Sequence, residues 1–321
     1  MTRRHWLGSL CLILTLISCD QKCDPPGPGK ESTLQKGKAA ILLVSHGSRS
    51  KRWRDMLLQV ETRTRERLLA LPTVGGTATA FLEYSEPSVA SRLKEFDEKG
   101  IDRVLLVLLF LTVSSHSFDD IPCLYGAKHD AATIARFQAE GIEIYSPRAR
   151  VEMSQELDFG NLLERNLKRR IGKLSQNASE EGVVLIAYGS RTYLDEWEAL
   201  FARLARNLEK STGIETWSHG WCGHLVHYRK APTREAIRRV LAKKQTALVL
   251  PVLVAHDPMF QGKIIGGAIE EMPEKDRIRY RPDAILPDPD LEEWIVEAAR
   301  EFVAPGTGPR TLGDRHRGGE E

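Results

Sequence analysis

The chain has 321 residues, a length that corresponds to about two domains of ordinary size. Hydrophobic residues make up 41% of it, enough for packed cores, and the 28% of charged residues is an ordinary share. The formal net charge of +2 argues against a nucleic-acid-binding protein, although local arginine clusters can still bind an anionic small molecule.

The N-terminus has the features of an export signal. Two arginines precede an apolar run, residues 6–17, that is short for a transmembrane helix but suits a signal peptide. The run ends in Leu16-Ile17-Ser18-Cys19, which resembles the bacterial lipoprotein box, and this resemblance implies cleavage before Cys19 and a lipid on its thiol. We therefore expect residues 1–18 to be a lipoprotein-type signal peptide, with an ordinary secretory signal as the alternative. The expected location is the bacterial cell envelope, with the protein lipid-anchored to the membrane and facing the periplasm or the exterior.

The first half of the chain alternates predicted strands and helices. Residues 19–38 are rich in Pro, Gly, Lys and Ser and are expected to form a flexible tether. The elements expected after it are strand 39–45, helix 53–71, strand 77–82, helix 89–99, strand 103–111, helix 125–140 and strand 142–146. Because the first and third of these strands are continuous apolar runs, they are typical of strands buried on both faces of a parallel sheet.

The second half repeats this order. The stretch from Val183 to Arg191 matches that from Ile41 to Arg49, including the Gly-Ser-Arg ending, with Tyr188 in place of His46. The elements expected are helix 152–171, polar linker 173–182, strand 183–187, helix 194–210, strand 215–217, helix 233–243, strand 246–254 and helix 290–303.

This repetition predicts an α/β fold of two similar open parallel-sheet domains. The first is expected at 39–150 and carries the active half, and the second is expected at 183–303. Residues 151–182 would form a connecting helix and linker, and residues 304–321 a disordered tail.

Three polar residues of the first half follow the predicted strands: His46, Glu83 and His116. Because the carboxyl ends of parallel strands meet at one edge of a sheet, these side chains can lie over one cleft. Two imidazoles and a carboxylate suit a borderline divalent metal such as cobalt, nickel, zinc or ferrous iron, and they accept protons near neutral pH. The alternatives are a histidine that only bonds backbone atoms and a glutamate that is solvated or faces the dipole of the next helix.

Other polar groups are weaker candidates. Asp119 and Asp120 favour a helix cap over a metal site. The stretch from His219 to His227 holds three histidines and Cys222, and is interpreted either as a loop with incidental histidines or as a second metal or haem contact. His256 and Asp257 end another predicted strand and are candidates for facing the same cleft.

The order and spacing of three motifs resemble those of the CbiX/SirB-type sirohydrochlorin chelatases. The motifs are Ser45-His46-Gly47-Ser48-Arg49, then Phe81-Leu82-Glu83 with Pro87-Ser88, then Leu109-Phe110-Leu111 through His116 to Asp120-Ile121-Pro122. The resemblance covers residues 39–147 well and the second half more loosely. It implies a chelatase-like fold of two similar domains with a cleft between them.

The resemblance also implies an activity, the ATP-independent insertion of a divalent metal into sirohydrochlorin or a related tetrapyrrole. The metal would be cobalt in the first place, or ferrous iron or nickel, and no nucleotide would be needed. His46 and His116 match the family's two active-site histidines, and Glu83 its acidic position. We expect both histidines to bind the metal and accept protons with the help of Glu83, while Arg49 and Arg52 hold substrate carboxylates.

Two other functions remain open at this point. A lipid-anchored carrier of metal or tetrapyrrole would keep the fold but lack turnover. An envelope hydrolase using His and Asp is disfavoured because the chain lacks a convincing serine or cysteine nucleophile motif. The oligomeric state is not fixed by the sequence, since two repeats in one chain can replace a dimer of single units.

Overall fold

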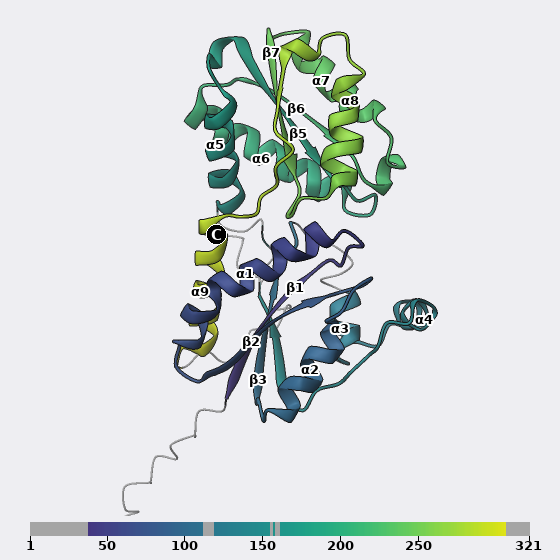
Figure 1. Cartoon of the computed structure of the whole chain (residues 1–321), viewed down its shortest axis with the longest axis vertical. Coiled ribbons are helices and arrows are strands. Elements are labelled where there is room, and N and C mark those ends of the chain that lie inside the picture. Colours follow the sequence, from purple (N-terminus) through teal and green to yellow (C-terminus); the bar gives the residue numbers. More distant parts are fainter. Residues whose placement is uncertain (1–37, 112–118, 155–156, 158–160, 306–321) are drawn as a thin grey trace, which may run out of the picture. The chain divides into compact units, whose positions relative to one another are not determined.

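The computed structural model describes residues 38–111, 119–154, 157 and 161–305. They form two four-stranded parallel sheets with helices, drawn in Figure 1. This confirms the α/β class predicted from the sequence. Residues 1–37, which include the predicted signal peptide and lipidation site, lie outside the described residues, as do residues 306–321 of the predicted tail and His116. Within the described ranges no helix combines the length and apolar character needed to cross a membrane.

The first sheet has the strand order β2-β1-β3-β4. Its central strand β1 (Ala39–Ser45) is buried along its whole length, as its continuous apolar sequence predicts. It pairs in parallel with β2 (Val74–Phe81) and β3 (Arg103–Leu108), and β3 pairs with β4 (Arg150–Met153). The helices of this half are α1 (Lys51–Leu69), α2 (Val89–Glu98), α3 (Ile121–Leu124) and α4 (Ala131–Glu140).

The second sheet repeats this topology with the order β6-β5-β7-β8. Its central strand β5 (Glu181–Ala187) is again buried throughout. The other strands are β6 (Thr216–Trp221), β7 (Thr246–Val252) and β8 (Ile278–Tyr280). The helices of this half are α5 (Leu162–Leu174), α6 (Leu194–Thr212), α7 (Ala231–Leu241), the π-helical segment Pro258–Gly266, α8 (Gly267–Glu270) and α9 (Pro289–Val303).

The two repeats exchange their last helices. Helix α5 follows β4 of the first sheet but packs against α6 and β7, whereas α9 follows β8 but packs against α1 and β3. Figure 1 shows α9 beside α1, where Arg63 pairs with Glu292 and Arg67 donates to Glu293 over 2.5 Å. As a result the described residues form one compact unit. The domain boundaries expected from the sequence stay predictions.

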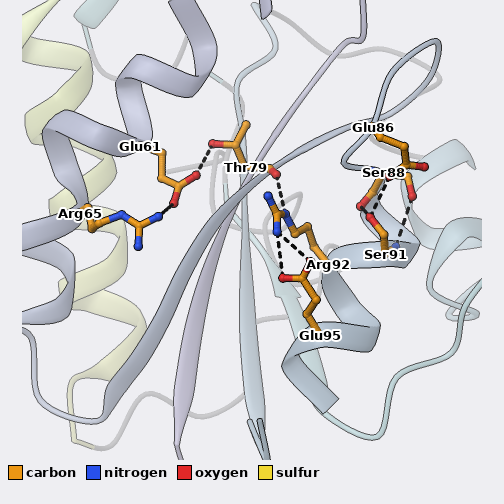
Figure 2. Close-up of polar contacts among 8 residues, drawn as sticks. All are labelled: Glu61, Arg65, Thr79, Glu86, Ser88, Ser91, Arg92 and Glu95. Atoms are coloured by element: carbon orange, nitrogen blue, oxygen red, sulfur yellow. Dashed lines mark hydrogen bonds and ion pairs between the residues drawn. The ribbon is translucent and has the colours of Figure 1, made fainter. Parts of the chain in front are cut away.

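Strand β2 is fixed to the helix on each side of it, as Figure 2 shows. The buried Thr79 donates from its hydroxyl to Glu61 of α1 over 2.9 Å, and its carbonyl accepts from Arg92 of α2 over 3.2 Å. Helix α2 begins at a serine cap, where the Ser88 hydroxyl accepts from the backbone of Ser91. Strand β2, which leads to Glu83, is therefore held by these side-chain contacts as well as by its backbone hydrogen bonds to β1.

One predicted strand was misplaced, and two predicted helices begin later than expected. The helix expected over 125–140 begins only at Ala131. Residues 142–146 form no strand; the fourth strand of the sheet begins at Arg150, which pairs with Arg103. The helix expected over 152–171 begins only at Leu162, because residues 150–153 continue the sheet. Tyr145, Arg148 and Ala149, which lie before this strand, donate hydrogen bonds to the carboxylate of Asp97 at the end of α2.

The carboxylate of Asp97 is 5% exposed and accepts hydrogen bonds from the Tyr145 hydroxyl over 2.8 Å and from the Arg148 backbone over 3.0 Å. Burial alone would raise the pKa of Asp97, but these donors together lower it below its usual value. A carboxylate with a lowered pKa contributes stability above its unfolded pKa of about 3.9 and loses it as the pH falls through the folded value.

We therefore predict that Asp97→Asn lowers the free energy of unfolding by about 2 kcal/mol at pH 7, because bonds to a charged acceptor are lost. The difference from wild type should shrink as the pH falls below about 4. Urea unfolding at several pH values measures both effects. Asp55→Asn, on an exposed stretch of α1, is the control and should stay within about 0.5 kcal/mol. A difference that is constant with pH would contradict this account of Asp97.

Candidate active site at the end of the first sheet

The candidate site begins where β1 and β2 end side by side. Ser45 pairs with Phe81, and the Leu82 amide continues the ladder by donating to the Ser45 carbonyl over 2.9 Å. His46 and Glu83 follow directly, and His46 Nδ1 lies 3.0 Å from Glu83 Oε1. The His46 side chain is 38% exposed and that of Glu83 12%, so the imidazole is open to a ligand while the carboxylate supports it from inside. The parallel register thus brings together two residues that are 37 positions apart.

A glycine permits this approach. A Cβ on Gly47 would lie 1.5 Å from the carbonyl oxygen of Glu83, much closer than any van der Waals contact. The next residue is also held, since the Ser48 carbonyl accepts from the Ser85 hydroxyl over 3.0 Å and from Arg54 over 2.6 Å. The loops after β1 and β2 therefore form one rigid structure.

The His46–Glu83 pair has the chemistry of a metal-handling or proton-accepting group. When Nδ1 carries the ring proton it donates to Glu83, which orients the imidazole and makes Nε2 a better electron-pair donor. Among the residues that the structure describes, no three His, Cys, Asp or Glu side chains gather into a metal site. The predicted third member, His116, lies outside the described residues, so its role stays a prediction.

The predicted substrate-binding arginines lie close to this pair in sequence. Arg49 stacks on Tyr84, with 5.8 Å between its guanidinium carbon and the ring centroid. Arg52 is exposed at the start of α1. Their role in holding carboxylates stays a prediction.

Asp119 and Asp120 form ion pairs and do not cap a helix through their side chains. Asp119 accepts from Lys128 over 2.5 Å, and Asp120 pairs with Arg136 of α4. Although Asp120 occupies the N-cap position of α3, its side chain makes no capping bond there.

The matching edge of the second sheet is aromatic. Ala187 pairs with Trp221 as Ser45 pairs with Phe81, so Tyr188 occupies the position of His46 and Gly223 that of Glu83. The hydroxyls of Tyr188 and Tyr228 lie 3.3 Å apart, and the Tyr188 ring meets Phe260 edge-on at 5.4 Å. Burial raises the pKa of Tyr188, and so this phenol stays neutral at physiological pH. The second repeat has lost both residues of the His–Glu pair.

The histidines between 219 and 227 do not share one site. His219 pairs with Glu198 of α6 at 3.0 Å, while the His224 ring lies 5.2 Å from that of Tyr188. Cys222 is buried and donates to the Ala187 carbonyl, and burial raises the pKa of its thiol to about 12. These contacts favour the interpretation of incidental histidines.

The end of β7 does reach the first repeat. Asp257 accepts a hydrogen bond from the Ser48 hydroxyl over 3.1 Å, two residues from His46. The neighbouring His256 is buried, and its pKa is lowered by burial and, less strongly, by the charge of Arg52. The sequence made His256 and Asp257 candidates for facing the same cleft as His46, but nothing local in either segment shows that Ser48 and Asp257 meet.

Known proteins resemble part of this chain. The CbiX family model matches residues 40–174. The sirohydrochlorin cobaltochelatase of Methanocaldococcus jannaschii is 33% identical over 92 residues, 28% of this chain and 61% of that protein. The sirohydrochlorin cobaltochelatase of Saccharolobus solfataricus is 31% identical over 104 residues, 32% of this chain and 76% of that protein. The chain belongs to the CbiX family.

Solved structures extend the likeness of this CbiX-family chain to its whole fold. The sirohydrochlorin chelatase SirB of Bacillus subtilis subspecies spizizenii, in complex with cobalt, superposes with a TM-score of 0.58 at 18% identity. That match covers 83% of this chain and 95% of SirB. SirB from Bacillus subtilis with Fe3+ gives a TM-score of 0.59 at 19% identity, covering 83% of this chain and 96% of that one. At these identities the likeness concerns the fold, two parallel sheets in one chain.

We predict that Gly47→Ala disrupts the site, because the new methyl group must displace the Glu83 backbone. Overpacking of this kind costs about 1–3 kcal/mol of stability. Binding of Co2+ to the His46 edge, measured by calorimetry, should weaken at least about tenfold, since small displacements in a preorganised site have large effects.

Gly172→Ala is the matched control. Its Cβ would meet nothing within 4 Å on α5, so this variant should bind Co2+ normally and gain up to about 1 kcal/mol of stability. Unchanged Co2+ affinity in Gly47→Ala would show that the close approach of Gly47 and Glu83 does not shape the site.

Proposed function

We propose that this chain inserts a divalent metal into sirohydrochlorin or a related tetrapyrrole without a nucleotide. The observation that carries the proposal is the contact between His46 Nδ1 and Glu83 Oε1 at the ends of adjacent parallel strands. It supplies a half-exposed imidazole backed by a mostly buried carboxylate. The names of the relatives support the same reaction, although the chain spans only 61% of the M. jannaschii protein's length.

The reaction replaces two pyrrole N–H protons with one metal ion, so two protons must leave as M2+ enters. A neutral imidazole can bind the metal weakly and then release it, or it can accept one of the protons. We assign these steps to His46 and His116, with Glu83 orienting His46 and accepting charge. The protons then pass from the imidazoles to solvent, and the enzyme returns to its starting state.

The surroundings of the pair suit a flat, polycarboxylated substrate. Tyr84 directly follows Glu83, is 64% exposed and has a φ of +61°, a left-handed conformation that is uncommon away from functional sites. Arg49 stacks on its ring and can pair with a carboxylate. The aromatic edge around Tyr188 and Tyr228 offers further flat, neutral surface to a macrocycle.

Cobalt is the metal that we propose first, with ferrous iron and nickel as alternatives. Histidine nitrogens with one carboxylate are borderline ligands that suit all three ions. The curated relatives are named cobaltochelatases, whereas the two Bacillus structures contain cobalt in one case and Fe3+ in the other. We further propose that the chain works in the bacterial cell envelope, anchored through lipid on Cys19, as the sequence motif at 16–19 implies.

The test uses the full chain in detergent, mixed anaerobically with sirohydrochlorin and Co2+ and followed by visible absorption. Wild type should turn over many times. His46→Ala and His116→Ala should each lower kcat by about 10²- to 10⁴-fold, the range expected when a general base is removed. Glu83→Gln should have a smaller effect in the same direction, because the amide can still hold the imidazole.

The control is His219→Ala, which removes a histidine that also pairs with a glutamate but belongs to the second sheet. This variant should keep kcat within about twofold of wild type, as expected for a residue remote from the reacting atoms. Tight binding of pigment or metal without accelerated insertion would show that the protein is a carrier and not a chelatase. Full activity in His46→Ala would contradict the assigned site.

A further inference from the structure

The second repeat contributes one buried carboxylate to the loop that carries His46. Asp257, 8% exposed, lies just after β7 and accepts a hydrogen bond from the Ser48 hydroxyl over 3.1 Å. The two residues are 209 positions apart in the chain and belong to different sheets. This hydrogen bond is therefore a direct polar link from the second repeat to the candidate active-site loop.

Asp257 is itself held firmly. Its other carboxylate oxygen accepts from the Met259 amide over 2.9 Å and so caps the π-helical segment 258–266. Its own amide donates to the buried Gln261 side chain over 3.0 Å. π-Helical segments are rare and occur preferentially near functional sites. Asp257 is therefore fixed by contacts that do not involve Ser48.

Ser48 in turn joins the two loops of the site. Its hydroxyl oxygen accepts from the Ser50 amide over 3.0 Å, next to the start of α1. Its carbonyl oxygen accepts from Ser85, two residues after Glu83. A displacement of Ser48 would therefore move both His46 and the loop that carries Glu83.

We propose that Asp257 is a positioning residue for His46, acting through the Ser48 hydroxyl. The proposal rests on the metal-insertion function proposed above. It gives the second repeat a task in catalysis although its own His–Glu pair has been replaced by Tyr188 and Gly223. A buried carboxylate makes a strong, charge-assisted bond to a hydroxyl, which suits a contact that must hold a loop in place.

The experiment compares four variants of the full chain in detergent: Ser48→Ala, Asp257→Ala, the double variant and Asp257→Asn. Ser48→Ala and Asp257→Ala should each lower kcat roughly tenfold with KM for sirohydrochlorin within about twofold, since misplacing a catalytic group affects mainly the chemical step. The double variant should lose much less kcat than the two single effects combined, because both changes remove the same bond between Ser48 and Asp257. Asp257→Asn should regain most of kcat, because an amide oxygen still accepts from Ser48.

The controls separate positioning from folding. Ser190→Ala changes the counterpart of Ser48 in the second repeat and should leave kcat unchanged. Ser48→Ala loses the bond from the Ser50 amide but leaves the helix cap of Asp257 intact, so its unfolding temperature should fall less than that of Asp257→Ala, which loses the cap. Wild-type kcat in Ser48→Ala, or additive effects in the double variant, would overturn the proposal.

A second readout, the affinity for Co2+ alone measured by calorimetry, keeps the two proposals distinguishable. If wild type binds Co2+ but does not insert it, the chelatase function fails. A loss of Co2+ affinity of about tenfold or more in Ser48→Ala would then still support the positioning role, in the range expected for a displaced ligand support. Unchanged affinity would overturn it.

Discussion

The parallel pairing of β1 with β2 is the constraint on which the candidate site depends. The register that places Ser45 beside Phe81 also fixes where His46 and Glu83 leave the sheet. Gly47 lets the two loops touch. A one-residue slip of β1 would exchange the side chains that it sends into the cores on its two faces, which fixes the register. The geometry of the His–Glu pair is thus set by the buried centre of the first sheet.

The second repeat has the same scaffold as the first but lacks its His–Glu pair. The topology and register are kept, yet Tyr188 and Gly223 stand where the first repeat has its imidazole and carboxylate. The repeat cannot be discarded, because α5 and α9 are exchanged between the two sheets and ion pairs such as Arg63 with Glu292 bind α9 to α1. An aromatic edge and the Asp257 contact with Ser48 are the features through which it can still serve the first repeat.

Much of this fold could be predicted because its signals are local. The apolar runs around Leu42 and Leu106 predicted buried parallel strands, and His46 after β1 and Glu83 after β2 were correctly placed at the sheet edge. The failures came from contacts distant in sequence. The segment at 142–146 is apolar enough for a strand, but the Tyr145 amide donates to the Leu124 carbonyl and the Tyr145 hydroxyl donates to Asp97. The link between Ser48 and Asp257 has no sequence signature at all, since a serine and an aspartate are ordinary turn residues.

The most direct test of the central claim is to locate Co2+ by anomalous scattering in crystals of the protein soaked with the metal alone. Our account predicts a peak about 2.0–2.2 Å from an imidazole nitrogen of His46, with Glu83 close behind it, and loss of that peak in His46→Ala. A metal bound instead at His219 and Glu198, or a peak unaffected by His46→Ala, would contradict the assignment of the first sheet's edge as the active site.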